Sequence, residues 1–280
     1  MVTPRTTEEA VAALGAPDAV AVAGGTAVGL LLAQRLLQPS TLVLLRHIPE
    51  LSEVEADDGT ATVRIGAGVT MAELVRHHGV ARRLPALAAA AGAVGNPRVR
   101  ALATVGGAIA HADPRQDLPP VLVALDAAID VAGPTGRRMV RAADMFLGFM
   151  ETALGAGELV TGVRLAAPPG LRSHYARFTP QSAEDYPTVA AAATVELADD
   201  GVIRRAALAL AGVGPAPVAV EVGSALTGLM PATAGPAVAE VARQAMASCT
   251  PTDDRRGSAR YKRAMVEVWS RRALLACLAG

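Results

Sequence analysis

Residues 104–120 read TVGGAIAHADPRQDLPP, a turn of small residues followed by two spaced carboxylates and the start of a helix. Gly106 and Gly107 lack a Cβ, so they can take a positive φ and let a ligand approach the backbone closely. We expect their N–H groups to be free to face an anion. Asp113 and Asp117 then add fixed hydrogen-bond acceptors. We interpret this stretch as a ligand cradle.

A second Gly-Gly turn lies earlier in the chain, at residues 23–27 (AGGTA). It follows an apolar run at 19–23, which predicts a strand, and precedes an apolar helix candidate at 28–37. Two such turns indicate a ligand that is extended and has two ends. The sequence GGTAVG at 24–29 lacks the Gly-x-Gly-x-x-Gly spacing of a Rossmann dehydrogenase, so we disfavour that fold.

The hydrophobic pattern around the two turns predicts an α+β fold built from three units. Thr6 and Glu9 form a candidate capping box for a first helix that ends at Gly15. Thr70 and Glu73 form a second capping box. In the first two units we expect strands at 19–23, 41–45, 61–67, 127–131 and 159–165, and helices at 28–37, 70–78, 85–93 and 118–125.

The third unit begins after a Pro-Pro-Gly linker at 168–170. The turn sequence ADDG at 198–201 is a strong signal for an antiparallel hairpin. An acidic, polar stretch at 53–60 forms the expected boundary between the first and second units. The expected elements of the third unit are hairpin strands at 188–197 and 202–211 and closing helices at 236–248 and 258–278.

Composition limits the classes of function. Acidic and basic residues balance at 26 each, and aromatic residues make up only 2% of the chain. Nucleic-acid binding usually needs a basic face or stacking aromatics, so this class is disfavoured. The first residues lack a basic segment followed by an apolar core, and no apolar run is long enough to span a bilayer. We therefore expect a cytoplasmic protein.

The two cysteines, Cys249 and Cys277, are too few to hold an iron–sulfur cluster with four thiolates within this chain. We expect both to be small buried hydrophobes. The histidines lack the spacing of zinc motifs, so we assign no metal site, although His111 near Asp113 stays open. We assign no catalytic side chain either.

Six short motifs then occur in an order that identifies a family. Any one of them is weak evidence, but six in sequence with sensible gaps are strong. The chain resembles the medium, FAD-binding subunit of the molybdenum hydroxylases, the group that contains xanthine dehydrogenase and aerobic carbon monoxide dehydrogenase. The motifs are AGGT at 23–26, IPEL at 48–51, RIGA at 64–67 with TMAEL at 70–74, TVGG at 104–107 with HADP at 111–114, GELVT at 157–161 and SARY at 258–261.

The resemblance implies the two-subdomain FAD-binding fold of the vanillyl-alcohol-oxidase/PCMH type at 1–55 and 56–168, followed by a C-terminal α+β domain at 171–280. It also implies a dimer of heterotrimers, in which a large partner carries the molybdopterin cofactor and a small partner carries two [2Fe-2S] clusters. FAD in this chain would pass electrons from the clusters to an external acceptor. The isoalloxazine performs the redox step, so a nucleophile or acid–base dyad is not required.

The resemblance further implies which residues bind the cofactor. The diphosphate is expected against the backbone N–H groups of both Gly-Gly turns. Asp117 would hydrogen-bond the ribityl chain or nearby flavin atoms, and would also serve as the N-cap of the helix at 118–125. Asp113 is equally suited to a ligand role and to an Asp-Pro turn. The diphosphate set is Ala23, Gly24, Gly25, Thr26, Ala27, Thr104, Gly106 and Gly107.

At the isoalloxazine end, the resemblance places Val160, of the segment 158–161, on one face of the ring. A later segment from Arg177 to Asp185 is expected nearby, and Tyr186 is the second candidate for ring contact. The alternative for Tyr186 is a buried strand residue with a satisfied hydroxyl.

The chain departs from the family at three positions. Ala108 stands where the family usually has Asn, and Gln181 and Ser182 stand where basic residues are common. With Arg177 as the remaining cation, the flavin should have less positive charge around it, which should lower its reduction potential or weaken its semiquinone. These losses keep open a second hypothesis, a scaffold or assembly subunit that binds FAD poorly. A stand-alone FAD oxidase is disfavoured because nothing outside the flavin pocket resembles a substrate site.

Overall fold

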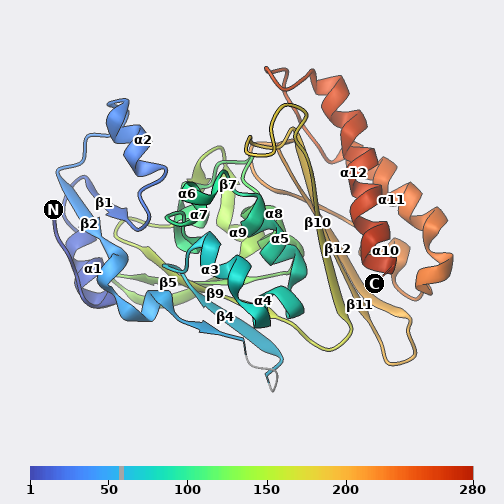
Figure 1. Cartoon of the computed structure of the whole chain (residues 1–280), viewed down its shortest axis with the longest axis horizontal. Coiled ribbons are helices and arrows are strands. Elements are labelled where there is room, and N and C mark those ends of the chain that lie inside the picture. The colour runs from blue at the N-terminus through green and yellow to red at the C-terminus, as the bar shows by residue number, and fades with distance from the viewer. Residues whose placement is uncertain (57–59, 280) are drawn as a thin grey trace.

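The computed structural model describes residues 1–56 and 60–279. Figure 1 shows a small N-terminal unit at one end, a central unit of sheet and helices, and a C-terminal sheet covered by helices at the other end. One hydrophobic core spans the first two units and reaches the C-terminal sheet, and another lies between that sheet and the last helices. The predicted α+β class is confirmed. Residues 57–59 of the predicted boundary at 53–60 lie outside the described residues.

The N-terminal unit is a small βαβ arrangement, in which the strands predicted at 19–23 and 41–45 form β1 and β2 and pair in parallel. Thr6 caps α1 by accepting a hydrogen bond from the Glu9 amide at 3.2 Å. The Glu9 carboxylate accepts from the Arg5 amide, so only half of the predicted capping box forms. The elements are α1 (Thr7–Leu14), β1 (Ala19–Val22), α2 (Val28–Ala33) and β2 (Thr41–Leu44).

Helix α2 ends at Ala33, so the predicted extension to residue 37 was wrong. Arg35 takes a positive φ of 56°, and the amides of Arg35 and Leu36 turn back to carbonyls in the last helical turn. This is a Schellman motif with an arginine where glycine is more usual. The motif satisfies the final carbonyls, and the helix therefore stops well before Pro39, the first proline that follows it.

In the described part of the chain, the central unit has one antiparallel sheet of five strands, in the order β3-β4-β9-β5-β6. These strands are β3 (Val54–Glu55), β4 (Thr62–Gly66), β9 (Leu159–Ala166), β5 (Ala128–Gly133) and β6 (Gly136–Arg141). Helices lie between this sheet and the C-terminal sheet (Figure 1). They are α3 (Met71–Arg76), α4 (His78–Arg83), α5 (Pro85–Ala93), α6 (Pro97–Arg100), α7 (Val105–His111) and α8 (Leu118–Ala124). A short excursion, α9 (Ala142–Met145), β7 (Phe146–Gly148) and β8 (Glu151–Thr152), completes the unit.

The second predicted capping box is fully formed. The Glu73 amide donates to Thr70 Oγ1 at 3.2 Å, and the Thr70 amide donates to Glu73 Oε2 at 2.7 Å. The predicted helix at 70–78 nevertheless divides at His77, whose backbone is extended. The box therefore fixes where α3 begins, but the next residues begin α4 separately.

The C-terminal unit is an antiparallel sheet, β10-β11-β12-β13, with the predicted hairpin at its centre. Successive residues of β11 are buried on opposite faces: Ala190 and Ala192 join the core with the central unit, and Ala191 and Ala193 join the core with the last helices. Helices α5 and α8 contact one face of the sheet, and α12 contacts the other. The elements are β10 (Leu171–Phe178), β11 (Val189–Leu197), β12 (Ile203–Ala211), β13 (Val218–Val220), α10 (Gly223–Leu226), α11 (Gly235–Ala247) and α12 (Ala259–Ala279).

Cys249 and Cys277 are both free and buried, as predicted. Burial raises the pKa of each thiol to about 12, so both are neutral thiols at physiological pH. Among residues 1–56 and 60–279, no helix is both long and apolar enough to cross a bilayer.

Candidate functional site

The two Gly-Gly turns lie against each other. A Cβ added to Gly24 would lie 1.7 Å from the carbonyl oxygen of Leu102, so the backbones of the two segments touch at this point. The Met71 amide donates to the next carbonyl, that of Ala103, at 2.9 Å, which fixes the second segment to α3. Contact this close is possible only for glycine. The fold therefore places the first turn beside the residues that lead into the second.

The first turn offers unpaired backbone donors. Gly25 takes a positive φ of 71° and bends the chain between β1 and α2. Within the described residues, the amides of Gly24, Gly25, Thr26 and Ala27 have no acceptor. These residues are only half-buried. A run of free amides in such a turn forms a concave site for an anion.

The second turn is different, and here the prediction was wrong. Gly106 and Gly107 lie within α7, and neither takes a positive φ. The Gly106 amide donates to the carbonyl of Ala67 at 2.8 Å, and the Gly107 amide donates to Thr104 Oγ1 at 3.1 Å. Neither N–H group is free. A Cβ on Gly106 would lie 2.6 Å from the Ala67 Cβ. This glycine therefore permits α7 to pack closely against Ala67, the residue that follows β4.

Asp113 forms the predicted Asp-Pro turn. Its Oδ1 accepts from the Arg115 amide at 2.9 Å, and both of its carboxylate oxygens accept from the Arg115 guanidinium at 3.2 Å. The side chain is buried, and its ligand role stays a prediction. Burial lowers the pKa of the neighbouring His111, against the raising effect of Asp113. Within the described residues, no group of three metal-binding side chains forms around this pair.

The prediction that Asp117 caps α8 was wrong. It occupies the N-cap position, but its side chain makes no capping hydrogen bond. The second and third helical residues are Pro119 and Pro120, which have no N–H to donate. Asp117 Oδ1 instead accepts from Tyr175 Oη at 2.5 Å and from Arg177 Nη1 at 2.8 Å. Burial raises the pKa of Asp117 even against the opposing effect of the arginine.

Arg177 is committed to protein acceptors. In addition to Asp117, its Nη1 donates to the Ala93 carbonyl at 2.6 Å, and its Nη2 donates to the carbonyls of Ala183 and Asp185. Its side chain is 12% exposed. Arg177 therefore joins α5, α8 and the segment before β11, and its predicted contact with a flavin stays a prediction.

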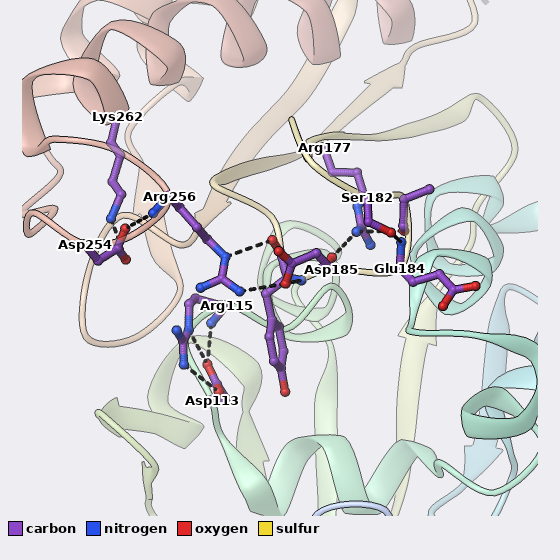
Figure 2. A network of polar contacts seen from close by, with 11 residues as sticks. Asp113, Arg115, Arg177, Ser182, Glu184, Asp185, Asp254, Arg256 and Lys262 are labelled. Carbon is purple, nitrogen blue, oxygen red and sulfur yellow. Dashed lines mark hydrogen bonds and ion pairs between the residues drawn. The ribbon is translucent and has the colours of Figure 1, made fainter.

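Tyr186 lies beside two guanidinium groups. The Arg115 group is 5.3 Å from the centre of its ring and the Arg256 group is 5.9 Å away. Tyr186 is 39% exposed in the segment between β10 and β11, so the alternative of a buried strand residue was wrong. Figure 2 shows Arg256 turned toward Asp185, whose Oδ1 it contacts at 2.6 Å. This hydrogen bond lowers the pKa of Asp185.

Three functional candidates in this region were missed by the sequence analysis: Tyr175, Arg115 and Arg256. Tyr175 and Arg177 are two residues apart in β10, so their side chains lie on the same face of the sheet. A strand prediction for this segment would have placed them together. The two arginines lie on loops far apart in the chain, and no sequence signal connects them. Both arginines also place positive charge beside Tyr186. The prediction of a lower flavin reduction potential did not include these two charges. That lowering stays a prediction.

The remaining candidates occupy defined places. Val160 lies inside β9 opposite Val131 and is buried, and its contact with a ring stays a prediction. Ala108 follows the closed turn inside α7. Gln181 and Ser182 are exposed, and Gln181 lines a cavity of about 260 Å³ with Asp185, Arg255 and Arg256.

Comparison with known families gives two matches along the chain. Residues 1–168 match a family described as the FAD binding domain in molybdopterin dehydrogenase. Residues 174–277 match the CO dehydrogenase flavoprotein C-terminal domain.

Individual relatives match over nearly the full length. The chain is 36% identical over 280 residues to the carbon monoxide dehydrogenase medium chain of Hydrogenophaga pseudoflava, and the match covers 99% of this chain and 96% of the relative. It is 33% identical over 260 residues to the nicotine 6-hydroxylase medium subunit of Paenarthrobacter nicotinovorans, with 92% and 89% covered. The solved carbon monoxide dehydrogenase of Hydrogenophaga pseudoflava aligns with a TM-score of 0.93 at 35% identity, over 99% of this chain and 96% of that one.

Proposed function

The chain belongs to the family of FAD-binding medium subunits of the molybdenum hydroxylases, and from this premise we propose that it passes electrons from a partner's [2Fe-2S] clusters through FAD to an external acceptor. Its relatives are oxidoreductase subunits. The proposal concerns the direction of electron flow and the residues of this chain that hold the cofactor.

The observation that carries the proposal is the open first turn. The free amides of Gly24, Gly25, Thr26 and Ala27 fit the oxygens of a diphosphate, because such an anion needs several converging donors. The contact of Gly24 with Leu102 places the second turn beside them. In this proposal the first turn binds the diphosphate through its amides, and Thr104 and α7 form the opposite wall.

The other end of the cradle supports a place for the ring. Bound FAD supplies the redox chemistry, because its isoalloxazine exchanges electrons singly with clusters and in pairs with other acceptors. The protein has to bind and orient that ring. In our proposal Tyr186 covers one side of it, Val160 lies toward the other, and Arg177 keeps Asp117 oriented at the ribityl chain.

The partners follow from what this chain lacks. Its two cysteines are buried free thiols and are too few to hold a cluster, so we place the clusters in another chain. We propose a small [2Fe-2S] subunit and a large molybdopterin subunit, assembled as a dimer of heterotrimers. The substrate is chosen by the large subunit and is not encoded in this chain.

The cofactor assignment is tested by co-expressing the chain with its partner subunits, purifying the complex and releasing its flavin by denaturation. We expect one FAD for each copy of this chain. Gly24→Ala should lose the flavin, because its new Cβ would collide with Leu102. Gly29→Ala is the matched control, since Gly29 is exposed and a Cβ there would meet no heavy atom within 4 Å. A wild-type complex without flavin, even after excess FAD, would favour the scaffold hypothesis.

Electron flow is tested on the same complex by following the absorbance of the clusters and of the flavin after a substrate of the large subunit is added. We expect the clusters and then the flavin to become reduced. In the Gly24→Ala complex, the clusters should stay reduced while the external acceptor is left oxidised. Equal acceptor reduction with and without FAD would contradict the proposal.

A further inference from the structure

Lys262 is the only lysine among 26 basic residues, and it is buried. Its side chain is 3% exposed and lies in the first turn of α12. An ammonium is costly to bury unless it is paired, and a positive charge near a helix N-terminus is opposed by the helix dipole. An apolar residue would therefore serve the helix and its core better, and the lysine calls for another explanation.

The Lys262 ammonium holds a turn. Nζ contacts Asp254 Oδ2 at 2.8 Å and donates to the Thr252 carbonyl at 2.8 Å. Asp254 Oδ1 accepts from the Arg256 amide at 2.8 Å, and two backbone bonds between Asp254 and Gly257 close the turn. Burial acts to raise the pKa of Asp254, but the hydrogen bond from Lys262 and the other donors keep it below its ordinary value.

The same turn presents Arg256 to the segment that carries Tyr186. Arg256 Nη2 contacts Asp185 Oδ1 at 2.6 Å, and its Nε donates to the Tyr186 carbonyl at 3.3 Å. The guanidinium also lies 5.9 Å from the centre of the Tyr186 ring. Figure 2 shows the chain of contacts running from Lys262 through Asp254 and Arg256 to Asp185.

We propose that Lys262 is a positioning residue for the flavin site. Through Asp254 and Arg256 it fixes the segment 182–186, so that Tyr186 is held where it meets the cofactor. This inference rests on the proposed FAD site, and Lys262 itself touches no cofactor. A lysine suits the role because its compact ammonium reaches two acceptors from a buried position on α12. The planar guanidinium of an arginine is broader and would need more space there.

The positioning step is tested by hydrogen exchange on the full-length chain, comparing Lys262→Met with Arg263→Met. Methionine keeps the buried stem and removes the ammonium. Arg263 is the next residue of α12, is exposed, and loses the same charge. We expect amides at 182–186 and 252–257 to exchange about tenfold faster in K262M and to be unchanged in R263M. Unchanged exchange at 182–186 in K262M overturns the proposal.

The link to the cofactor is tested in the assembled complex by titration with FAD. We expect K262M to raise the Kd for FAD about tenfold and to shift the flavin absorbance bands, and K262R to restore part of both. D254N removes the charge of Asp254, the more exposed member of the ion pair with Lys262. It should change the Kd for FAD and the flavin absorbance in the same direction as K262M.

The outcomes separate the two proposals. If the wild-type complex binds no FAD, the proposed function fails and this inference fails with it. If the wild type binds FAD, but K262M and D254N bind it equally well, only the positioning role fails. A lower melting temperature in K262M, with unchanged exchange at 182–186 and an unchanged Kd, identifies a purely structural lysine and also overturns the proposal.

Discussion

The two Gly-Gly turns have the same dipeptide and opposite backbone chemistry. In the first, the amides of Gly24 and Gly25 find no acceptor among the residues that the structure describes, and Gly25 takes a positive φ. In the second, the amides of Gly106 and Gly107 are paired within the protein, and both residues are helical. The first turn therefore presents donors to a ligand, and the second provides a rigid wall on which the first is seated.

The comparison teaches that a glycine pair does not by itself mark an anion site. Gly106 is required because α7 packs closely on Ala67, and Gly24 is required because its turn touches Leu102. Among the four glycines of the two turns, Gly25 alone takes a positive φ and is required for its own backbone conformation. Substitutions at these positions should separate packing from cofactor binding.

Gly24→Ala should have the largest effect. The added Cβ would lie 1.7 Å from the Leu102 carbonyl oxygen, so the first turn must move away from the second. Overpacking of this kind costs about 3 kcal/mol, which corresponds to about a 100-fold increase in the Kd for FAD if the cost falls on the cradle. Fluorescence titration of the flavin-free complex measures the Kd, with Gly29→Ala as control. A Kd within about twofold of wild type would show that the turns need not touch.

Gly106→Ala should lower the stability of the fold more than the affinity for FAD. Its Cβ would meet the Ala67 side chain at 2.6 Å, so we expect the free energy of unfolding to fall by about 2 kcal/mol. Because the Gly106 amide is already paired, the Kd of the folded protein for FAD should change by less than about tenfold. Urea denaturation and FAD titration measure the two quantities. A large loss of affinity without a loss of stability would contradict the closed second turn.

Gly25→Ala should have an intermediate effect. The new side chain has room, since its nearest neighbour is 3.6 Å away, but the positive φ is unfavourable for alanine by about 1–2 kcal/mol. Gly25→Asn should recover part of this loss, because asparagine tolerates the left-handed region better. Urea denaturation of the three proteins measures the difference. Equal stability of the alanine and wild-type chains would mean that the turn relaxes out of this conformation.

Thr104→Ala should have the smallest effect and act on stability. Thr104 Oγ1 is the acceptor for the Gly107 amide, and loss of such a cap costs about 1 kcal/mol. Thr104→Ser keeps the hydroxyl and should unfold like the wild type. If Thr104→Ala instead bound FAD more tightly at unchanged stability, the freed Gly107 amide would be a cofactor donor after all.

Local signals in the sequence predicted much of the fold. Helix α5 was predicted with its observed bounds, the capping box of Thr70 and Glu73 formed, and the hairpin around 198–201 was confirmed. Each depends on residues that are neighbours in the chain. Strand β10 was missed because polar residues such as Arg172 and His174 interrupt its apolar pattern.

The candidate site was predictable in its parts and not in its connections. The prolines that leave Asp117 without a helix amide to cap could have been read from the sequence. Its actual partners, Tyr175 and Arg177, come from another unit and meet it only through the packing of β10 on α8. The same is true of Arg115 and Arg256, which flank Tyr186 from distant loops.

The sequence by itself determined the family, through six motifs in order, and the residue at which α3 begins, through the capping box of Thr70 and Glu73. It did so because motif order and helix capping are properties of residues close together in the chain. Tertiary structure alone decided which glycine amides are free, because the carbonyl of Ala67 and the hydroxyl of Thr104 pair with one turn while no acceptor reaches the other in the described chain. Hydrogen-bond pairing depends on which distant groups packing brings within reach, and that is settled only when the units fold together.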